Sequence, residues 1–161
     1  MKLRNLLLSF LLIAGLSAMA VASDKAVKIS AGQSPYKVKQ GGVAQIEVII
    51  DINPGFHINS NRPGDEFLIP TALKLEKLDG VTATRVIYPR AKTQKFPFSE
   101  KPLSVYEGRA VLKFSARSLA SKAAGNYTLK GKLTVQACNN EACLRPATID
   151  VNIPIEIVSA K

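Results

Sequence analysis

The chain has 161 residues, a length that suits one domain once an N-terminal targeting segment is set aside. Its formal net charge of +10 comes from scattered lysines and arginines without a dense basic run interleaved with aromatic residues, which argues against nucleic-acid binding. Two cysteines and one histidine fall short of the four nitrogen or sulfur ligands of a structural zinc site, so neither a metal nor another cofactor is expected.

The chain begins like a secretory signal peptide. Two positive charges precede the apolar stretch 6–16, and Ala-x-Ala cleavage motifs end at Ala20 and Ala22. The apolar stretch is short for a transmembrane helix, although a retained N-terminal anchor is the alternative, and no later segment has the roughly 18 continuous apolar residues of a membrane span. The sequence therefore predicts a signal peptide over 1–22 and one exported domain over 23–161, located in the periplasm without stable membrane insertion.

Alternation of apolar and polar residues dominates the rest of the chain. In 43–52, 127–138 and 147–157, hydrophobic side chains fall on one face and polar side chains on the other, as in half-buried strands. Turn-forming residues separate the segments, and 118–124 could hold a short helical turn. Four further strands are expected, at 26–31, 71–78, 81–88 and 109–116. About seven to nine short strands predict an all-β fold, an immunoglobulin-like antiparallel β-sandwich.

Cys138 and Cys143 decide the chemical interpretation, and a structural disulfide is the default for two cysteines in an exported chain. Immunoglobulin domains instead join cysteines far apart in sequence and pack them on a Trp, which this chain lacks. A disulfide closing so short a loop stabilises the fold by only about 2 kcal/mol. Strand alternation places Cys138 on the face of Thr134 and Gln136, away from the core, unless a β-bulge precedes it. An outward disulfide would be accessible to an attacking thiolate, which favours exchange chemistry.

The segment 92–102 is too irregular for a strand and contains Phe96, Phe98 and two prolines. Long ordered loops in small domains are often functional, so this loop could cover the disulfide and open for a partner. The alternative is a surface crossover whose phenylalanines close the edge of the sandwich. His57 is a lone histidine, and such a residue is more often structural than catalytic.

Several short motifs, each weak alone, follow one another in a specific order. They are Gly-Phe-His-Ile-Asn-Ser-Asn at 55–61, Phe-Leu-Ile-Pro-Thr at 67–71 with Leu73 and Leu75, Tyr88-Pro89, Val-Tyr-Glu-Gly at 105–108, Val-Gln-Ala-Cys at 135–138 and Cys-Leu-Arg-Pro at 143–146. In this order the motifs resemble the N-terminal periplasmic domain of the thiol:disulfide interchange protein DsbD. The resemblance extends over nearly all of the chain after the predicted signal peptide, with a spacer between the cysteines that is one residue shorter.

The resemblance implies an immunoglobulin-like fold with a redox-active disulfide across a hairpin. Cys143 would form mixed disulfides with partners, and Cys138 would be the resolving thiol. A cap loop, mapped to Phe96–Glu100 with Phe98 foremost, would shield the pair. The protein would then act as a thiol–disulfide oxidoreductase that relays electrons without a bound cofactor.

Four residues are possible neighbours of the cysteines. His57 and Asn59 fall where the DsbD family can carry tyrosines, and Tyr106 lies in one of the shared motifs. Arg145 follows Cys143 by two residues and could stabilise a thiolate there.

The family resemblance also implies partners. A membrane-embedded thiol reductase would supply electrons, and periplasmic thioredoxin-like or other disulfide-containing proteins would accept them. The chain shows no counterpart of the DsbD membrane-spanning part or of its C-terminal thioredoxin-like domain. It is therefore expected either to be a free-standing relay that docks onto a separate membrane reductase or to have kept the fold and lost the pathway. The alternative function is an exported β-sandwich protein-binding module that uses a sheet edge or the Phe96/Phe98 loop and has a merely structural disulfide.

Overall fold

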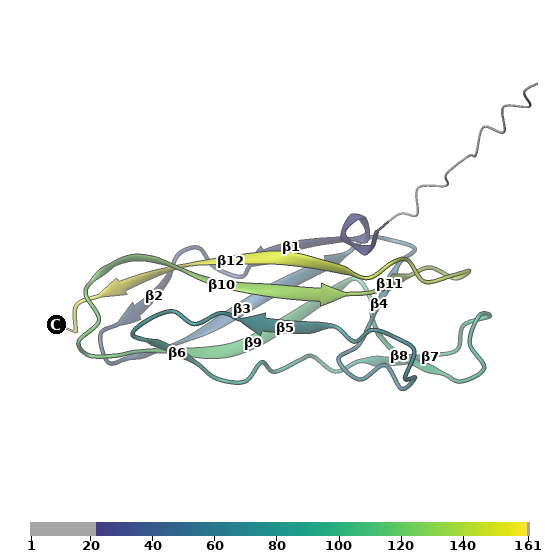
Figure 1. Cartoon of the computed structure of the whole chain (residues 1–161), viewed down its shortest axis with the longest axis horizontal. Coiled ribbons are helices and arrows are strands. Elements are labelled where there is room, and N and C mark those ends of the chain that lie inside the picture. Colours follow the sequence, from purple (N-terminus) through teal and green to yellow (C-terminus); the bar gives the residue numbers. More distant parts are fainter. Residues whose placement is uncertain (1–21, 161) are drawn as a thin grey trace, which may run out of the picture.

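The alternating segments of the chain form strands in three sheets, as Figure 1 shows for the computed structural model, which describes residues 22–160. The predicted signal peptide lies outside the described residues except for Ala22. The first sheet has the order β1–β3–β9–β6, with β1 at Val27–Ala31, β3 at Val43–Ile52, β9 at Arg109–Ser118 and β6 at Val81–Ala83. The second has the order β2–β12–β10–β5, with β2 at Tyr36–Lys39, β12 at Ala147–Val158, β10 at Gly125–Val135 and β5 at Ala72–Leu75.

These two sheets pack face to face around one hydrophobic core, to which each strand contributes every second residue. In β3, Ile46, Val48 and Ile50 are fully buried, and Ile153 and Ile155 of β12 join the same core from the other sheet. Each such buried side chain contributes about 1.5–3 kcal/mol of transfer free energy. Among the described strands, all pairs are antiparallel except β2 with β12. The predicted all-β, immunoglobulin-like sandwich is therefore confirmed.

Some details differ from the sequence predictions. The strands expected at 71–78 and 81–88 are only four and three residues long, and 118–124 forms a turn rather than a helical segment. The segment 92–102 was expected to contain no strand, yet its first three residues pair with a neighbouring strand. These short strands escape prediction because three or four residues carry too little alternation to be recognised. Within residues 22–160 no helix is long and apolar enough to cross a membrane.

A third, smaller sheet lies at the end of the sandwich opposite the C-terminus (Figure 1). Its order is β11–β4–β8–β7, with β11 at Ala137–Cys138, β4 at His57–Asn59, β8 at Leu103–Tyr106 and β7 at Lys92–Gln94. A short 3-10 helix, η1, at Ser23–Ala26 precedes β1. Because β11 follows β10 after a single unpaired residue, Gln136, the third sheet continues the second one at its end.

The third sheet is covered on both of its faces. On one face, Ile58, Tyr106 and Ala137 are register partners and belong to the main core. On the other face, Val105 belongs to a separate cluster with Phe96 and Leu103, against which Leu68 and Phe98 pack. A strand that is covered on both sides has no exposed face, which explains why His57–Asn59 shows no alternation in burial.

Candidate functional site

Cys138 and Cys143 form a disulfide across the hairpin that follows β10. Their Cα atoms are 3.9 Å apart and the two residues form an antiparallel β-bridge. The side chain of Asn139 shapes the connecting turn, because its Oδ1 accepts hydrogen bonds from the backbone N–H groups of Glu141 at 2.9 Å and Ala142 at 2.8 Å. Asparagine commonly stabilises tight turns in this way. The sequence therefore fixes locally the turn that brings the two sulfur atoms together.

The two cysteines differ in exposure. Cys138 is 0% exposed, whereas Cys143 is partly exposed. The alternation argument was right about direction, because Ala137 faces the main core and Cys138 faces the other way, opposite His57. It was wrong about access, because the second apolar cluster covers that face of the third sheet. Of the two sulfur-bearing residues, only Cys143 reaches the protein surface.

Three aromatic rings form a stack on the face of the third sheet that carries Cys138. The His57 ring lies 4.0 Å from the Phe96 ring, centroid to centroid, and 6.4 Å from the Phe98 ring. Phe96 is buried and Phe98 only partly so, although the family resemblance pointed to Phe98 as the foremost covering residue. The stack joins β4, next to the disulfide, to the loop after β7.

His57 lies directly opposite Cys138 in the β4–β11 register, so the two side chains share one face of the sheet. Directly opposed residues have Cβ atoms about 4.5–5.5 Å apart. The His57 side chain is buried and its Nε2 atom has no hydrogen-bond partner. Burial lowers the pKa of His57 below its ordinary value, and the charge of Glu107 opposes this shift more weakly. The imidazole is thus held neutral beside the disulfide.

Polar side chains hold the cysteine hairpin against the rest of the third sheet. Gln136 Oε1 accepts hydrogen bonds from Asn59 Nδ2 and from the Ile69 N–H, both at 2.9 Å, and Gln136 Nε2 donates to the Leu144 carbonyl at 3.4 Å. Asn59 also donates to the Ile69 carbonyl at 3.0 Å, while its Oδ1 is buried without a partner. The sequence analysis placed Gln136 in a motif and on the outward face of its strand, and this bridging role was missed.

Ser23 was also missed by the sequence analysis. Its hydroxyl donates to the Arg145 carbonyl at 2.6 Å and accepts a hydrogen bond from the Ala137 N–H at 2.9 Å. The Ser23 N–H donates to the same Arg145 carbonyl at 3.0 Å. The start of the described chain is therefore attached to both strands of the cysteine hairpin. Nothing in the sequence around Ser23 predicts this contact, because the sequence does not show that this serine is buried.

Of the other two predicted neighbours, Tyr106 lies on the far side of the third sheet and Arg145 is exposed. Tyr106 is the register partner of Ile58 and faces the main core, on the opposite side of the third sheet from Cys138. Its hydroxyl donates to Asn61 Oδ1 at 2.7 Å, and burial raises its pKa. The expectation that Tyr106 adjoins the disulfide is thus wrong, because odd and even positions of β8 face opposite ways. Arg145 is exposed, and its effect on Cys143 stays a prediction.

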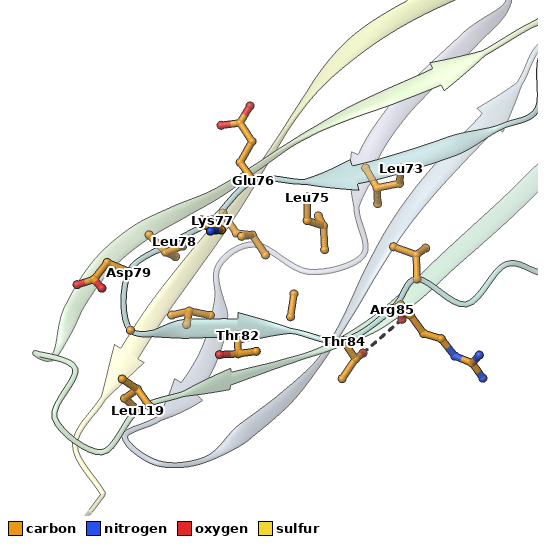
Figure 2. Close-up of a pocket in the computed structure, with 15 residues that line it drawn as sticks. Leu73, Leu75, Glu76, Lys77, Leu78, Asp79, Thr82, Thr84, Arg85 and Leu119 are labelled. Atoms are coloured by element: carbon orange, nitrogen blue, oxygen red, sulfur yellow. Dashed lines mark hydrogen bonds between the residues drawn. The ribbon is translucent and has the colours of Figure 1, made fainter.

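One sizeable cavity lies apart from the disulfide, and none of its lining residues belongs to the cysteine hairpin. It has a volume of about 980 Å³ and lies between β5 and β6, the edge strands of the two long sheets. Figure 2 shows that Glu76 and Arg85 point away from this space. Around the disulfide there are only shallow hollows of about 320 and 450 Å³, both bordered by Glu107 and by Asn140 of the cysteine loop. Neither cysteine lines these hollows or the larger cavity.

Comparison with known proteins gives a family match and several similar solved structures, two of which are described here. The family model described as the N-terminal part of the thiol:disulfide interchange protein DsbD matches residues 21–154. The crystal structure of the Neisseria meningitidis DsbD N-terminal domain in the reduced form superposes with a TM-score of 0.51 at 19% identity, covering 81% of this chain and 86% of that one. The N-terminal periplasmic domain of ScsB from Proteus mirabilis gives a TM-score of 0.50 at 18% identity, covering 79% of this chain and 45% of that one. Among curated proteins, none matches by sequence.

Proposed function

This chain belongs to the DsbD N-terminal domain family, and from that premise we propose that it relays reducing equivalents in the periplasm through the Cys138–Cys143 pair. The family carries out thiol–disulfide exchange in general. The finer proposal is that a membrane-embedded thiol reductase reduces the disulfide, and that the resulting dithiol reduces thioredoxin-like or other disulfide-containing proteins. Periplasmic location is supported by the family and by the predicted signal peptide.

The unequal burial of the two cysteines carries this proposal. An attacking thiolate approaches a disulfide in line with the S–S bond, and the far sulfur leaves with the electron pair. When the thiolate attacks Cys143, the attacked sulfur belongs to a partly exposed residue. The leaving sulfur then belongs to Cys138, which is buried. A purely structural disulfide gains nothing from exposing one of its ends.

Each half of the relay is balanced. A thiolate of the donor attacks Cys143 Sγ, forms a mixed disulfide and displaces the Cys138 thiolate, which takes up a proton. The second donor thiol then displaces Cys143, so the donor leaves as a disulfide and this chain keeps two thiols. In the second half, the Cys143 thiolate attacks the acceptor disulfide and releases one acceptor thiolate. Cys138 then attacks Cys143 Sγ, which restores the Cys138–Cys143 bond and releases the other acceptor sulfur, so the acceptor leaves with two thiols.

The loop at Phe96–Glu100 is proposed to act as a cap over the pair. The stack of Phe96 on His57 supports this, since it lies on the face that Cys138 shares. Shallow hollows in place of a deep pocket support a protein rather than a small molecule as the thiol partner.

Trapping of mixed disulfides tests the proposal. In a Cys138→Ser variant the resolving thiol is absent, so partners should stay bound to Cys143 and be released by dithiothreitol. The matched variant Cys143→Ser keeps only the buried cysteine and should trap far less. If neither variant captures a protein and the Cys138→Ser/Cys143→Ser double variant keeps the chain's function in the cell, the disulfide is structural and the chain is a binding module.

A further inference from the structure

The clearest unexplained feature beside the disulfide is the imidazole of His57. It is 3% exposed, it lies opposite Cys138, and its Nε2 is buried without a hydrogen-bond partner. Buried polar atoms without partners are uncommon and call for an explanation, because each costs about 1–3 kcal/mol. The stack of His57 on Phe96 fixes the plane of the imidazole. It supplies no hydrogen bond to either ring nitrogen.

The redox state of the cysteines changes what is available to Nε2. A disulfide has no proton to donate, so the oxidised hairpin offers this nitrogen nothing. Reduction gives Cys138 a thiol, which is a donor, on the same face and in the directly opposed position. Reduction therefore places a hydrogen-bond donor on the same face of the sheet as the buried nitrogen, which has no partner in the oxidised protein.

We propose that His57 Nε2 is the proton acceptor for the Cys138 thiol when this thiol resolves a mixed disulfide on Cys143. This inference rests on the proposed relay function and names a further residue for it. The proton passes from Cys138 Sγ to His57 Nε2. The Cys138 thiolate then attacks Cys143 Sγ, the S–S bond within the chain forms, and the bond from Cys143 to the partner breaks with the electron pair on the partner sulfur. The partner thiolate is reprotonated by His57 or by solvent.

The surroundings keep the imidazole available as a base. Burial in an apolar stack disfavours the imidazolium form, so the neutral ring prevails near neutral pH. Neither β4 nor β11 contributes another titratable group except Cys138 itself. Among the described charged groups nearby, Glu107 forms an ion pair with Lys92 at 3.1 Å, and Lys95 donates to the carbonyls of Ser99 and Glu100.

The resolving step can be isolated with a small-molecule disulfide. Reduced protein mixed with equimolar 5,5′-dithiobis(2-nitrobenzoic acid) releases one thionitrobenzoate when Cys143 reacts and a second when Cys138 resolves the adduct. His57→Phe keeps a flat ring for the stack on Phe96 and removes both nitrogens. We expect its second release to be at least about tenfold slower at pH 7, with recovery to the wild-type rate well above the ordinary thiol pKa of about 8.5. Phe96→Leu weakens the stack, keeps the base, and should keep the wild-type pH profile.

A second measurement stands even if His57→Phe does not fold. His57 is the single histidine of the chain, so imidazole ¹⁵N signals of untagged wild-type protein belong to this residue alone. The Nε2 shift should move towards the value of a hydrogen-bonded acceptor on reduction. Equal shifts in both redox states, an unchanged second release in His57→Phe, or a slowing by the same factor at every pH would each overturn the inference. Failure of the relay itself would show separately, as an absence of trapped partners on the Cys138→Ser variant.

Discussion

The body of the sandwich and the third sheet at its end follow different rules of burial. In the body, alternate residues of long strands face one core, and polar side chains such as Lys132 and Asp150 pair at the surface, 2.8 Å apart. In the third sheet, both faces are covered and polar groups are enclosed, including the unpartnered His57 Nε2 and Asn59 Oδ1. Regular burial gives stability, whereas unsatisfied polar burial is tolerated where chemistry benefits from it. The disulfide lies in the second kind of region.

The largest effect is expected from a substitution that destabilises the core of the sandwich and leaves the thiol chemistry of the third sheet unchanged. Phe114 of β9 is among the largest fully buried side chains, so Phe114→Ala should lower the free energy of unfolding by about 3–5 kcal/mol. Urea unfolding followed by circular dichroism measures the loss. In whatever fraction stays folded, the second thionitrobenzoate release should keep the wild-type rate, because no part of the third sheet has changed. A change in that rate would show that the two regions are coupled.

Removal of the cap should change the chemistry of the disulfide as well as the stability of the fold. Phe96→Ala deletes a buried side chain of the smaller cluster, and loss of its burial should cost about 1.5–3 kcal/mol in the free energy of unfolding. Reduction of the disulfide by dithiothreitol should become faster, because the face that carries Cys138 loses its cover. Phe67→Ala is the matched control, since Phe67 is 85% exposed and should affect neither measurement. Equal reduction rates for wild type and Phe96→Ala would contradict the cap.

A smaller effect is expected for the polar link between the hairpin and the sheet. Gln136→Ala removes the acceptor of the exposed Ile69 N–H and of the part-buried Asn59 amide, so the free energy of unfolding should fall by about 0.5–1.5 kcal/mol. Gln45→Ala removes an exposed hydrogen bond of the body to Ser115 and should change stability by less than about 0.5 kcal/mol. Urea midpoints of the two variants compare the regions directly, and equal midpoints would refute the bridging role of Gln136.

The difference between the body of the sandwich and the third sheet also explains which features could be predicted from the sequence. The alternation of Ile46, Val48 and Ile50 predicts their strand. The separate alternation of β10 continues through Ala137, so the direction of Cys138 was predictable. The cover over Cys138 was not, because Phe96 comes from a distant segment that meets β4 only through tertiary packing. Long-range register also decides that His57 opposes Cys138 and that Tyr106 faces away, and no local pattern encodes such a register.

The smallest effect concerns pH and depends on His57 alone. Its pKa in the folded protein lies below the ordinary value of 6.5, so the unfolded chain binds a proton more readily than the folded one. The stability that the neutral imidazole supplies is therefore complete above about pH 6.5 and falls as the pH is lowered towards the folded pKa, by at most about 1.4 kcal/mol for each pH unit. Urea midpoints measured between pH 8 and 5 should show this decline in the wild type. His57→Phe should lack it, because the chain has no second histidine. A parallel decline in both proteins would assign the pH dependence to other groups, and the third sheet would then tolerate a charged imidazole next to the disulfide.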